Sequence, residues 1–189
     1  MRRIWCGISC GLIALGLIEL SQPPATAQDS GPSIVWLVRH ADRADNSPDS
    51  ALKKPEGEKR AQDLKTCLGG KAVTAIITTD KKRTVQTAEP IASKEGITPV
   101  VVPIADTAKG IKQNVELVAA KVRTMSGKVL VVGHSNTVAG IIEKLGGPPG
   151  LGDITVFHRL FILDFSKGNV AFDEMKYGVA PKSSKKKQC

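Results

Sequence analysis

Short runs of consecutive apolar residues alternate along this chain with longer segments in which apolar residues recur every three or four positions. The runs at 34–38, 72–78 and 128–132 are bounded by polar residues and glycine, which predicts strands buried on both faces of a parallel sheet. A shorter strand is predicted at 98–102. Two further strands, at 155–165 and 169–176, flank a turn-forming Ser-Lys-Gly sequence and predict a hairpin.

The intervening segments carry the periodicity of amphipathic helices. A first helix is predicted at 55–68, and a second begins after a cap at Thr79 or Asp80. Two further helices are predicted at 111–122 and at 138–145. In the second of these helices Val85 is expected on the apolar face with Ala88 and Ala92. Because strands and helices alternate, the fold class is α/β, a three-layer α/β/α sandwich. Its central sheet is mostly parallel, with the hairpin forming an antiparallel C-terminal part.

The first 27 residues have the organisation of a secretory signal peptide. Arg2 and Arg3 precede an apolar stretch, and Ala25-Thr26-Ala27 is a small-residue cleavage site. We therefore expect cleavage after Ala27 and a periplasmic or secreted protein; an uncleaved membrane anchor is the alternative. One domain is expected at 28–180, followed by a basic tail at 181–189.

Charge and cysteine content add little to this picture. Cleavage would lower the net charge from +9 to +8, and lysines of the tail supply four of those charges. The tail is interpreted as a solvated end or, alternatively, as a segment attracted to an anionic envelope surface. Cys67 and Cys189 would remain, without the spacing of a metal site. Export permits them to form a disulfide, but the preferred interpretation of Cys67 is a small buried hydrophobe.

Residues with catalytic potential follow three of the predicted strands. Arg39 and His40 follow the first, Arg83 lies shortly after the second, and His134 follows the fourth. The carboxyl ends of parallel strands share one edge of a sheet, so these side chains should converge. Two imidazoles and two guanidiniums suit a phosphate dianion. His40 can act as a nucleophile, whereas His134 can donate a hydrogen bond to the phosphate.

These residues occur within motifs that resemble those of the histidine phosphatase superfamily, which has the phosphoglycerate mutase-like fold. Arg39-His40-Ala41 resembles its Arg-His-Gly signature, with Ala in place of Gly. The remaining similarities are Leu52, Gly57, Arg60 and Ala61 in a segment one residue longer than usual, Thr79-Asp80-x-x-Arg83-Thr84-x-Gln86-Thr87-Ala88, Val132-Gly133-His134-Ser135-Asn136-Thr137, and Arg159-Leu160-Phe161.

The resemblance implies that His40 is the phosphorylated nucleophile and that Arg39, Arg83 and His134 form the phosphate pocket. It implies neither a metal nor an organic cofactor. The general acid is less clearly indicated. Asp42 is preferred because it lies two residues beyond the nucleophile, with Asp106 as the alternative.

Three further residues are expected to contact the substrate: Arg43, Asn46 and Ser135, the last through its backbone N–H. His158, which precedes the Arg-Leu-Phe sequence, is expected to have a structural or rim role.

The sequence thus predicts an exported phosphomonoesterase of the histidine acid phosphatase type, acting through phosphohistidine. We expect a small phosphorylated substrate and no nucleic-acid partner; the oligomeric state stays open. Two alternatives are a non-catalytic phosphate- or envelope-binding module that retains the pocket, and a phosphohistidine protein phosphatase. Export argues against the latter, because such enzymes serve cytoplasmic signalling.

Overall fold

The computed structural model describes residues 31–178 and 188–189. The predicted signal peptide and most of the predicted basic tail lie outside these residues. Within them, six strands form one sheet in the order β3-β2-β4-β1-β5-β6. Their bounds are β1 Pro32–Arg39, β2 Ala75–Thr78, β3 Val100–Val101, β4 Gly127–Gly133, β5 Arg159–Asp164 and β6 Ala171–Lys176.

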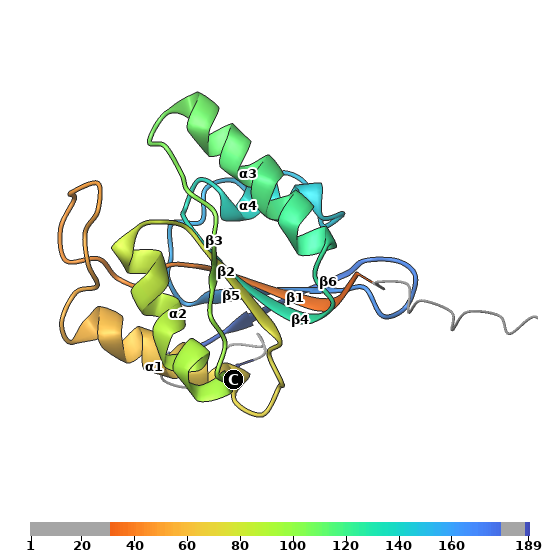
Figure 1. Ribbon diagram of the computed structural model, residues 1–189, viewed down its shortest axis with the longest axis horizontal. Coiled ribbons are helices and arrows are strands. Elements are labelled where there is room, and N and C mark those ends of the chain that lie inside the picture. The colour runs from red at the N-terminus through yellow and green to blue at the C-terminus, as the bar shows by residue number, and fades with distance from the viewer. Residues whose placement is uncertain (1–30, 179–187) are drawn as a thin grey trace, which may run out of the picture.

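The first four strands in sequence order pair in parallel, whereas β5 runs antiparallel to β1 and forms a hairpin with β6. Two pairs of helices cover the two faces of the sheet (Figure 1). Helices α1 and α2 lie on one face, and α3 and α4 lie on the other. Their bounds are α1 Glu56–Leu68, α2 Lys82–Glu95, α3 Ala108–Arg123 and α4 Val138–Lys144. The three-layer fold predicted from the sequence is confirmed.

Strand β1 lies inside the sheet and has apolar side chains on both of its faces. Val35 and Leu37 pack into the core beneath α3 and α4. Trp36 and Val38 pack into the core beneath α1 and α2. All four are at most 3 % exposed, which explains the uninterrupted apolar run in the sequence. The strand is thereby anchored on both sides, and this anchoring positions the polar residues that follow it.

Four local predictions differ from the structure. The strand predicted at 98–102 is only the two-residue β3, Val100–Val101. The second strand begins at Ala75 and not at position 72, because Ala72 has a φ of 55°, which is incompatible with a strand. The first strand of the hairpin begins at Arg159, so residues 155–158 belong to the preceding loop. Val85 is 39 % exposed and therefore does not face the core as expected.

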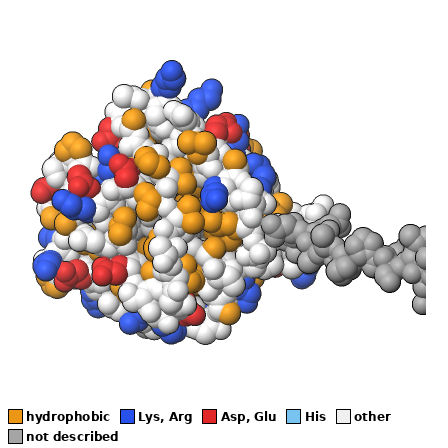
Figure 2. All heavy atoms as spheres, in the orientation of Figure 1, with side chains coloured by type: hydrophobic (Ala, Val, Ile, Leu, Met, Phe, Trp, Pro, Cys, Tyr) orange, Lys and Arg blue, Asp and Glu red, His pale blue; other side chains and the backbone are white. Residues whose placement is uncertain are grey.

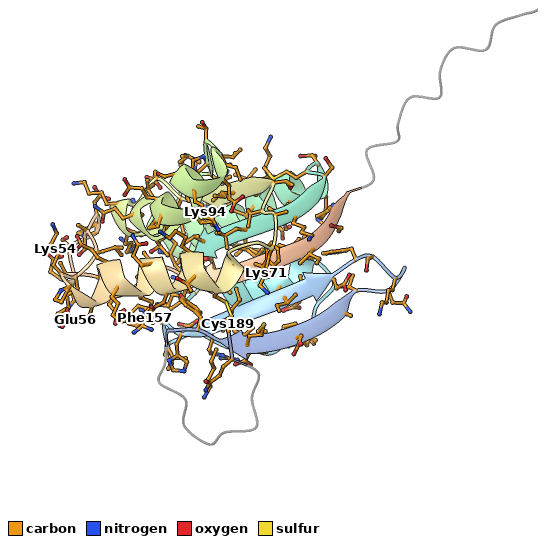
Figure 3. The ribbon with its side chains drawn as sticks, turned by 90° about the horizontal axis from the view of Figure 1, so that it is seen from below. Lys54, Glu56, Lys71, Lys94, Phe157 and Cys189 are labelled. Carbon is orange, nitrogen blue, oxygen red and sulfur yellow. A yellow bond between two sulfur atoms is a disulfide. The ribbon has the colours of Figure 1, made fainter. Side chains whose placement is uncertain are left out.

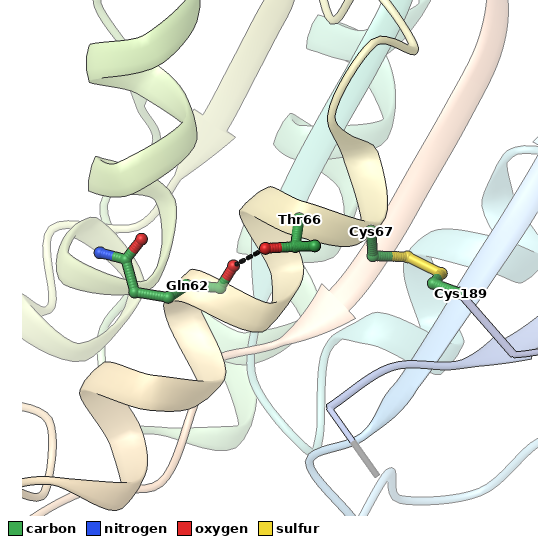
Figure 4. Close-up of a disulfide and its surroundings, with 4 residues drawn as sticks. All are labelled: Gln62, Thr66, Cys67 and Cys189. Carbon is green, nitrogen blue, oxygen red and sulfur yellow. Dashed lines mark hydrogen bonds between the residues drawn. A yellow bond between two sulfur atoms is a disulfide. The ribbon is translucent and has the colours of Figure 1, made fainter. Parts of the chain in front are cut away.

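A disulfide joins Cys67 to Cys189 and ties the end of the chain to α1 (Figure 4). The Cα atoms are 5.0 Å apart, within the range of disulfide-bonded pairs. In Figure 3, Cys189 lies at the opposite end of α1 from Lys54 and Glu56. Cys67 is thus both buried and paired, and the bond closes a large part of the chain.

Hydrophobic side chains gather over the middle of the face that carries α2, β3 and α3 (Figure 2). The exposed large hydrophobic residues on these elements are Val85, Val101 and Leu117. In the portion of the chain that the structure describes, no helix has the length and apolar character needed to span a bilayer.

Candidate active site

The carboxyl ends of β1 and β4 bring two imidazoles together. In the sheet register Arg39 is opposite Gly133, and the His40 N–H donates to the Gly133 carbonyl at 2.9 Å. The next residues along each strand are His40 and His134, whose ring centroids are 5.3 Å apart, edge to face. The two residues are 3 % and 5 % exposed. The predicted convergence of the two histidines is therefore present.

Two guanidiniums reach the same place from different elements. Arg83 is in the first turn of α2, and its Nη1 donates to the Pro48 carbonyl at 2.7 Å. Arg39 Nη1 donates to the carbonyls of Ile154 and Thr155. Neither guanidinium is in an ion pair among the described residues, and the Nε of each is buried without a hydrogen-bond partner. Their positive charge is therefore available to a bound anion.

The hydrogen bonds of His40 define its tautomer. Its Nδ1 lies 2.7 Å from the carbonyl oxygen of Ala41. A carbonyl only accepts, so Nδ1 carries the hydrogen and Nε2 keeps a free lone pair. The Ala41 N–H in turn donates to Thr87 Oγ1 at 2.9 Å, and Thr87 donates to the Arg83 carbonyl at 2.6 Å. Helix α2 thus anchors the residue that orients the His40 ring.

Burial and positive neighbours keep both imidazoles uncharged. Burial lowers the pKa of His40 to about 3; the hydrogen bond to Ala41 opposes this effect, and Arg83 and Arg39 add to it. Burial likewise lowers the pKa of His134 to about 3, with His40 and Arg83 contributing. The pKa of Arg83 is lowered by burial and by Arg43, an effect that Asp106 partly offsets. The site is therefore rich in donors and cations, as an anion site requires.

These side chains line a pocket of about 300 Å³. Arg43 and Asn46 contribute to its wall and are joined by a 2.7 Å hydrogen bond from Arg43 Nη2 to Asn46 Oδ1. Ser135 and Asp106 also line it. All three expected substrate contacts therefore lie at the pocket, as does one of the two candidate acids. The described residues contain no group of three or more His, Cys, Asp or Glu side chains arranged to hold a metal ion.

Comparison with known proteins agrees with this arrangement. Residues 35–105 match the sequence profile of the histidine phosphatase superfamily (branch 1). The chain thus resembles the histidine phosphatase superfamily over this part of its sequence. No curated protein sequence matches it significantly.

Several solved structures share the fold of this chain. One is the protein histidine phosphatase SixA complexed with tungstate, with 19 % identity and a TM-score of 0.57, covering 76 % of this chain and 96 % of that one. Another is a putative α-ribazole-5′-P phosphatase from Escherichia coli K-12, with 16 % identity and a TM-score of 0.60, covering 81 % and 100 %. A third is a mycobacterial glucosyl-3-phosphoglycerate phosphatase complexed with VO3, with 15 % identity and a TM-score of 0.55, covering 78 % and 100 %. At sequence identities this low, the structural similarity establishes the fold of the chain and nothing more about its function.

In this chain, Asp42 does not occupy the position expected of a general acid. Its Oδ2 accepts a hydrogen bond from Arg60 Nε at 2.5 Å, and its carbonyl accepts one from the Lys53 N–H at 2.8 Å. It does not line the pocket, whereas Asp106 does. The preference for Asp42 rested on its closeness in sequence to His40, but its pairing with Arg60 turns the carboxylate toward α1.

Contacts with the Asp42 backbone and side chain explain Gly57 and Arg60, two residues of the segment that resembles the superfamily motif. A side chain at Gly57 would place its Cβ 2.3 Å from the Asp42 carbonyl oxygen, so only glycine fits there. Arg60, three residues later on α1, binds the Asp42 carboxylate. These residues hold the loop after His40 in place, which is a structural role.

Several residues at the site were not singled out by sequence reasoning. The Phe157 ring lies 4.0 Å from the Arg39 guanidinium carbon, and its centroid is 5.9 Å from that of His40. Thr79 or Asp80 was expected to cap α2, but the cap residue is Lys81 and no side chain caps the helix. Thr79 instead contacts His134. In the sequence, the only signal for Phe157 is the long Gly- and Pro-rich loop that precedes it. Thr79 begins one of the motifs that resemble the superfamily, but its sequence position does not indicate a contact with His134.

Proposed function

We propose that this chain is an exported phosphomonoesterase that hydrolyses a small phosphate ester through a phosphohistidine intermediate on His40. The observation that carries the proposal is the hydrogen bond from His40 Nδ1 to the Ala41 carbonyl. It leaves the Nε2 lone pair free in a pocket where Arg39, Arg83 and His134 converge. The match of residues 35–105 to the histidine phosphatase superfamily profile supports phosphatase chemistry at this site.

In the first step the His40 Nε2 lone pair forms a bond to phosphorus, and the bond from phosphorus to the leaving oxygen breaks. Arg39 and Arg83 stabilise the charge on the oxygens of the transferred group. In the second step water attacks the phosphorus and the N–P bond breaks. Inorganic phosphate is released, and the neutral His40 side chain is regenerated. The low pKa of His40 keeps the nucleophile uncharged in mildly acidic as well as neutral solution.

Asp106 is the best placed general acid. It lines the pocket, and it is close enough to Arg83 to oppose the lowering of that group's pKa. In its protonated form it would donate to the leaving oxygen, and the resulting carboxylate would then accept a proton from the attacking water. Asp42 is unsuited to this role because it is paired with Arg60.

The size of the pocket and its cations favour a small anionic ester. A volume of about 300 Å³ holds a phosphoryl group and a modest leaving group. Arg43 and Asn46 would contact the leaving group, and the Ser135 backbone N–H would contact the phosphoryl oxygens. The N-terminal sequence pattern supports export, and an N-terminal sequence beginning at Gln28 in protein recovered outside the cytoplasm would test it; full-length chain retained in cells would contradict it.

The test of catalysis is hydrolysis of 4-nitrophenyl phosphate by the full chain and by His40→Ala. The variant should lose at least 10³-fold in kcat/KM, because no other group replaces the nucleophile. His158→Gln is the matched control, since this histidine is outside the pocket and should leave turnover intact. Equal rates for wild type and His40→Ala would refute the proposal. Phosphate binding without any turnover would instead favour a binding module.

A further inference from the structure

His134 is held by a chain of hydroxyl groups. Its Nε2 lies 2.9 Å from Thr79 Oγ1, and Thr79 Oγ1 lies 2.9 Å from Thr84 Oγ1. Thr79 and Thr84 are 2 % and 0 % exposed, so water does not compete for these contacts. These hydroxyl groups connect the His134 imidazole to the first turn of α2, next to Arg83.

The direction of each hydrogen bond follows from counting hydrogens. Thr84 Oγ1 lies 2.8 Å from the Lys81 carbonyl and 3.1 Å from the Thr79 carbonyl. Carbonyls only accept, so Thr84 donates its single hydrogen to them. The contact between the two hydroxyls must then use the hydrogen of Thr79.

Thr79 therefore has no hydrogen left for His134. Its oxygen already accepts from the Lys81 N–H at 3.3 Å, and its second lone pair is available to the imidazole. For the 2.9 Å contact to be a hydrogen bond, His134 Nε2 must be the donor. This is the opposite of His40, which donates from Nδ1.

We propose that Thr79 and Thr84 are positioning residues that hold His134 in its Nε2–H tautomer and so present the lone pair of Nδ1 to the pocket. His134 lines the pocket, and its Nδ1 has no hydrogen-bond partner among the described residues. Thr84 is adjacent to Arg83, so α2 sets both the guanidinium and the tautomer of the second imidazole.

The consequence for the reaction rests on the proposed function. A lone pair directed at a phosphate dianion is repulsive, so the complex must contain one additional proton, shared between Nδ1 and a phosphoryl oxygen. The charged or titratable groups that face His134 are His40, Arg83, Lys81 and Arg39, with Asp106 also in the pocket. The cations disfavour imidazolium in the empty site, so the proton enters with the substrate monoanion. kcat/KM should then fall above about pH 6, where a phosphate monoester loses its second proton.

The direct test is the tautomer of His134 in the ¹⁵N-labelled full chain at pH 7. Two-bond ¹H–¹⁵N correlation spectra distinguish the two neutral tautomers, and His134→Gln assigns the signals among the three histidines. Wild type should show Nε2–H for His134. Thr84→Ser should preserve this pattern. Thr84→Val frees the hydrogen of Thr79 to point at Nε2, so the Nδ1–H tautomer should appear.

The pH dependence of 4-nitrophenyl phosphate hydrolysis provides the functional readout. The upper limb of the kcat/KM profile should move to higher pH in Thr84→Val and stay in place in Thr84→Ser. A uniform loss of rate without a shift would mean that Thr84 has only a structural role. An Nδ1–H tautomer in wild type, or an unchanged tautomer in Thr84→Val, would overturn the inference. The tautomer measurement needs no turnover, so its failure is distinct from failure of the proposed function.

Discussion

Acidification from pH 7 to pH 5 should destabilise this fold, because His40 and His134 are buried in their uncharged form. Burial lowers the pKa of each to about 3, whereas an unfolded histidine titrates at about 6.5. Between these two values the unfolded chain binds more protons than the folded one. Stability from these groups is therefore complete above about pH 6.5 and is lost as the pH falls toward 3.

The magnitude follows from the two pKa values. At pH 5 the unfolded histidine is 1.5 pH units below its pKa of about 6.5, and the folded one is still neutral, so each contributes a loss of about 2 kcal/mol. Exposed carboxylates with lowered pKa values, such as Asp45 and Asp164, respond only below about pH 4. The interval from pH 7 to pH 5 therefore isolates the histidines.

Urea unfolding at the two pH values measures this loss. Wild type should lose about 4 kcal/mol of unfolding free energy, and His134→Gln should lose about half of that because one titrating group remains. His158→Gln is the control, since His158 is only partly buried and should leave most of the loss in place. An unfolding midpoint that stays constant between pH 7 and pH 5 would refute the claim that the two imidazoles are buried uncharged.

Three further predictions follow from other contacts. Asp106→Asn should slow hydrolysis of an alkyl phosphate about 10²-fold and hydrolysis of 4-nitrophenyl phosphate much less, because nitrophenolate leaves without a proton. Equal losses of rate for the two substrates would exclude Asp106 as the acid. Asp42→Asn should instead lower the melting temperature. Cys189→Ser or a thiol reductant should lower the free energy of unfolding by on the order of 5 kcal/mol, because the disulfide links residues that are 122 positions apart in the sequence. A melting temperature that does not change with reductant would contradict this. Arg43→Gln should raise KM more for 4-carboxyphenyl phosphate than for phenyl phosphate, and an equal change would show that Arg43 does not contact the leaving group.

The sequence sufficed for those parts of the structure that depend on periodicity and on parallel-sheet geometry. The apolar run before Arg39 and the one before Gly133 predicted buried strands of one parallel sheet, and His40 and His134 were expected to meet at its edge. They do so because the strands pair in register. The alternation of the two patterns likewise predicted the layered fold.

Contacts between side chains distant in sequence could not be predicted in this way. Asp42 lies two residues after the nucleophile in sequence, but its carboxylate pairs with Arg60 on α1 and is turned away from the pocket. Thr79 has the appearance of a helix cap, yet its hydroxyl is used by His134, 55 residues later. Such choices depend on which partner lies within 3 Å after folding, and periodicity contains no information about that.

The central claim is that His40 carries the phosphoryl group during turnover. The most direct measurement is to quench the full chain with alkali during hydrolysis of 4-nitrophenyl phosphate and map the phosphorylated residue by mass spectrometry. The peptide that contains His40 should carry an acid-labile phosphate, and the peptide that contains His134 should carry none. Phosphate found on His134, or turnover with no phosphohistidine in wild type, would contradict it.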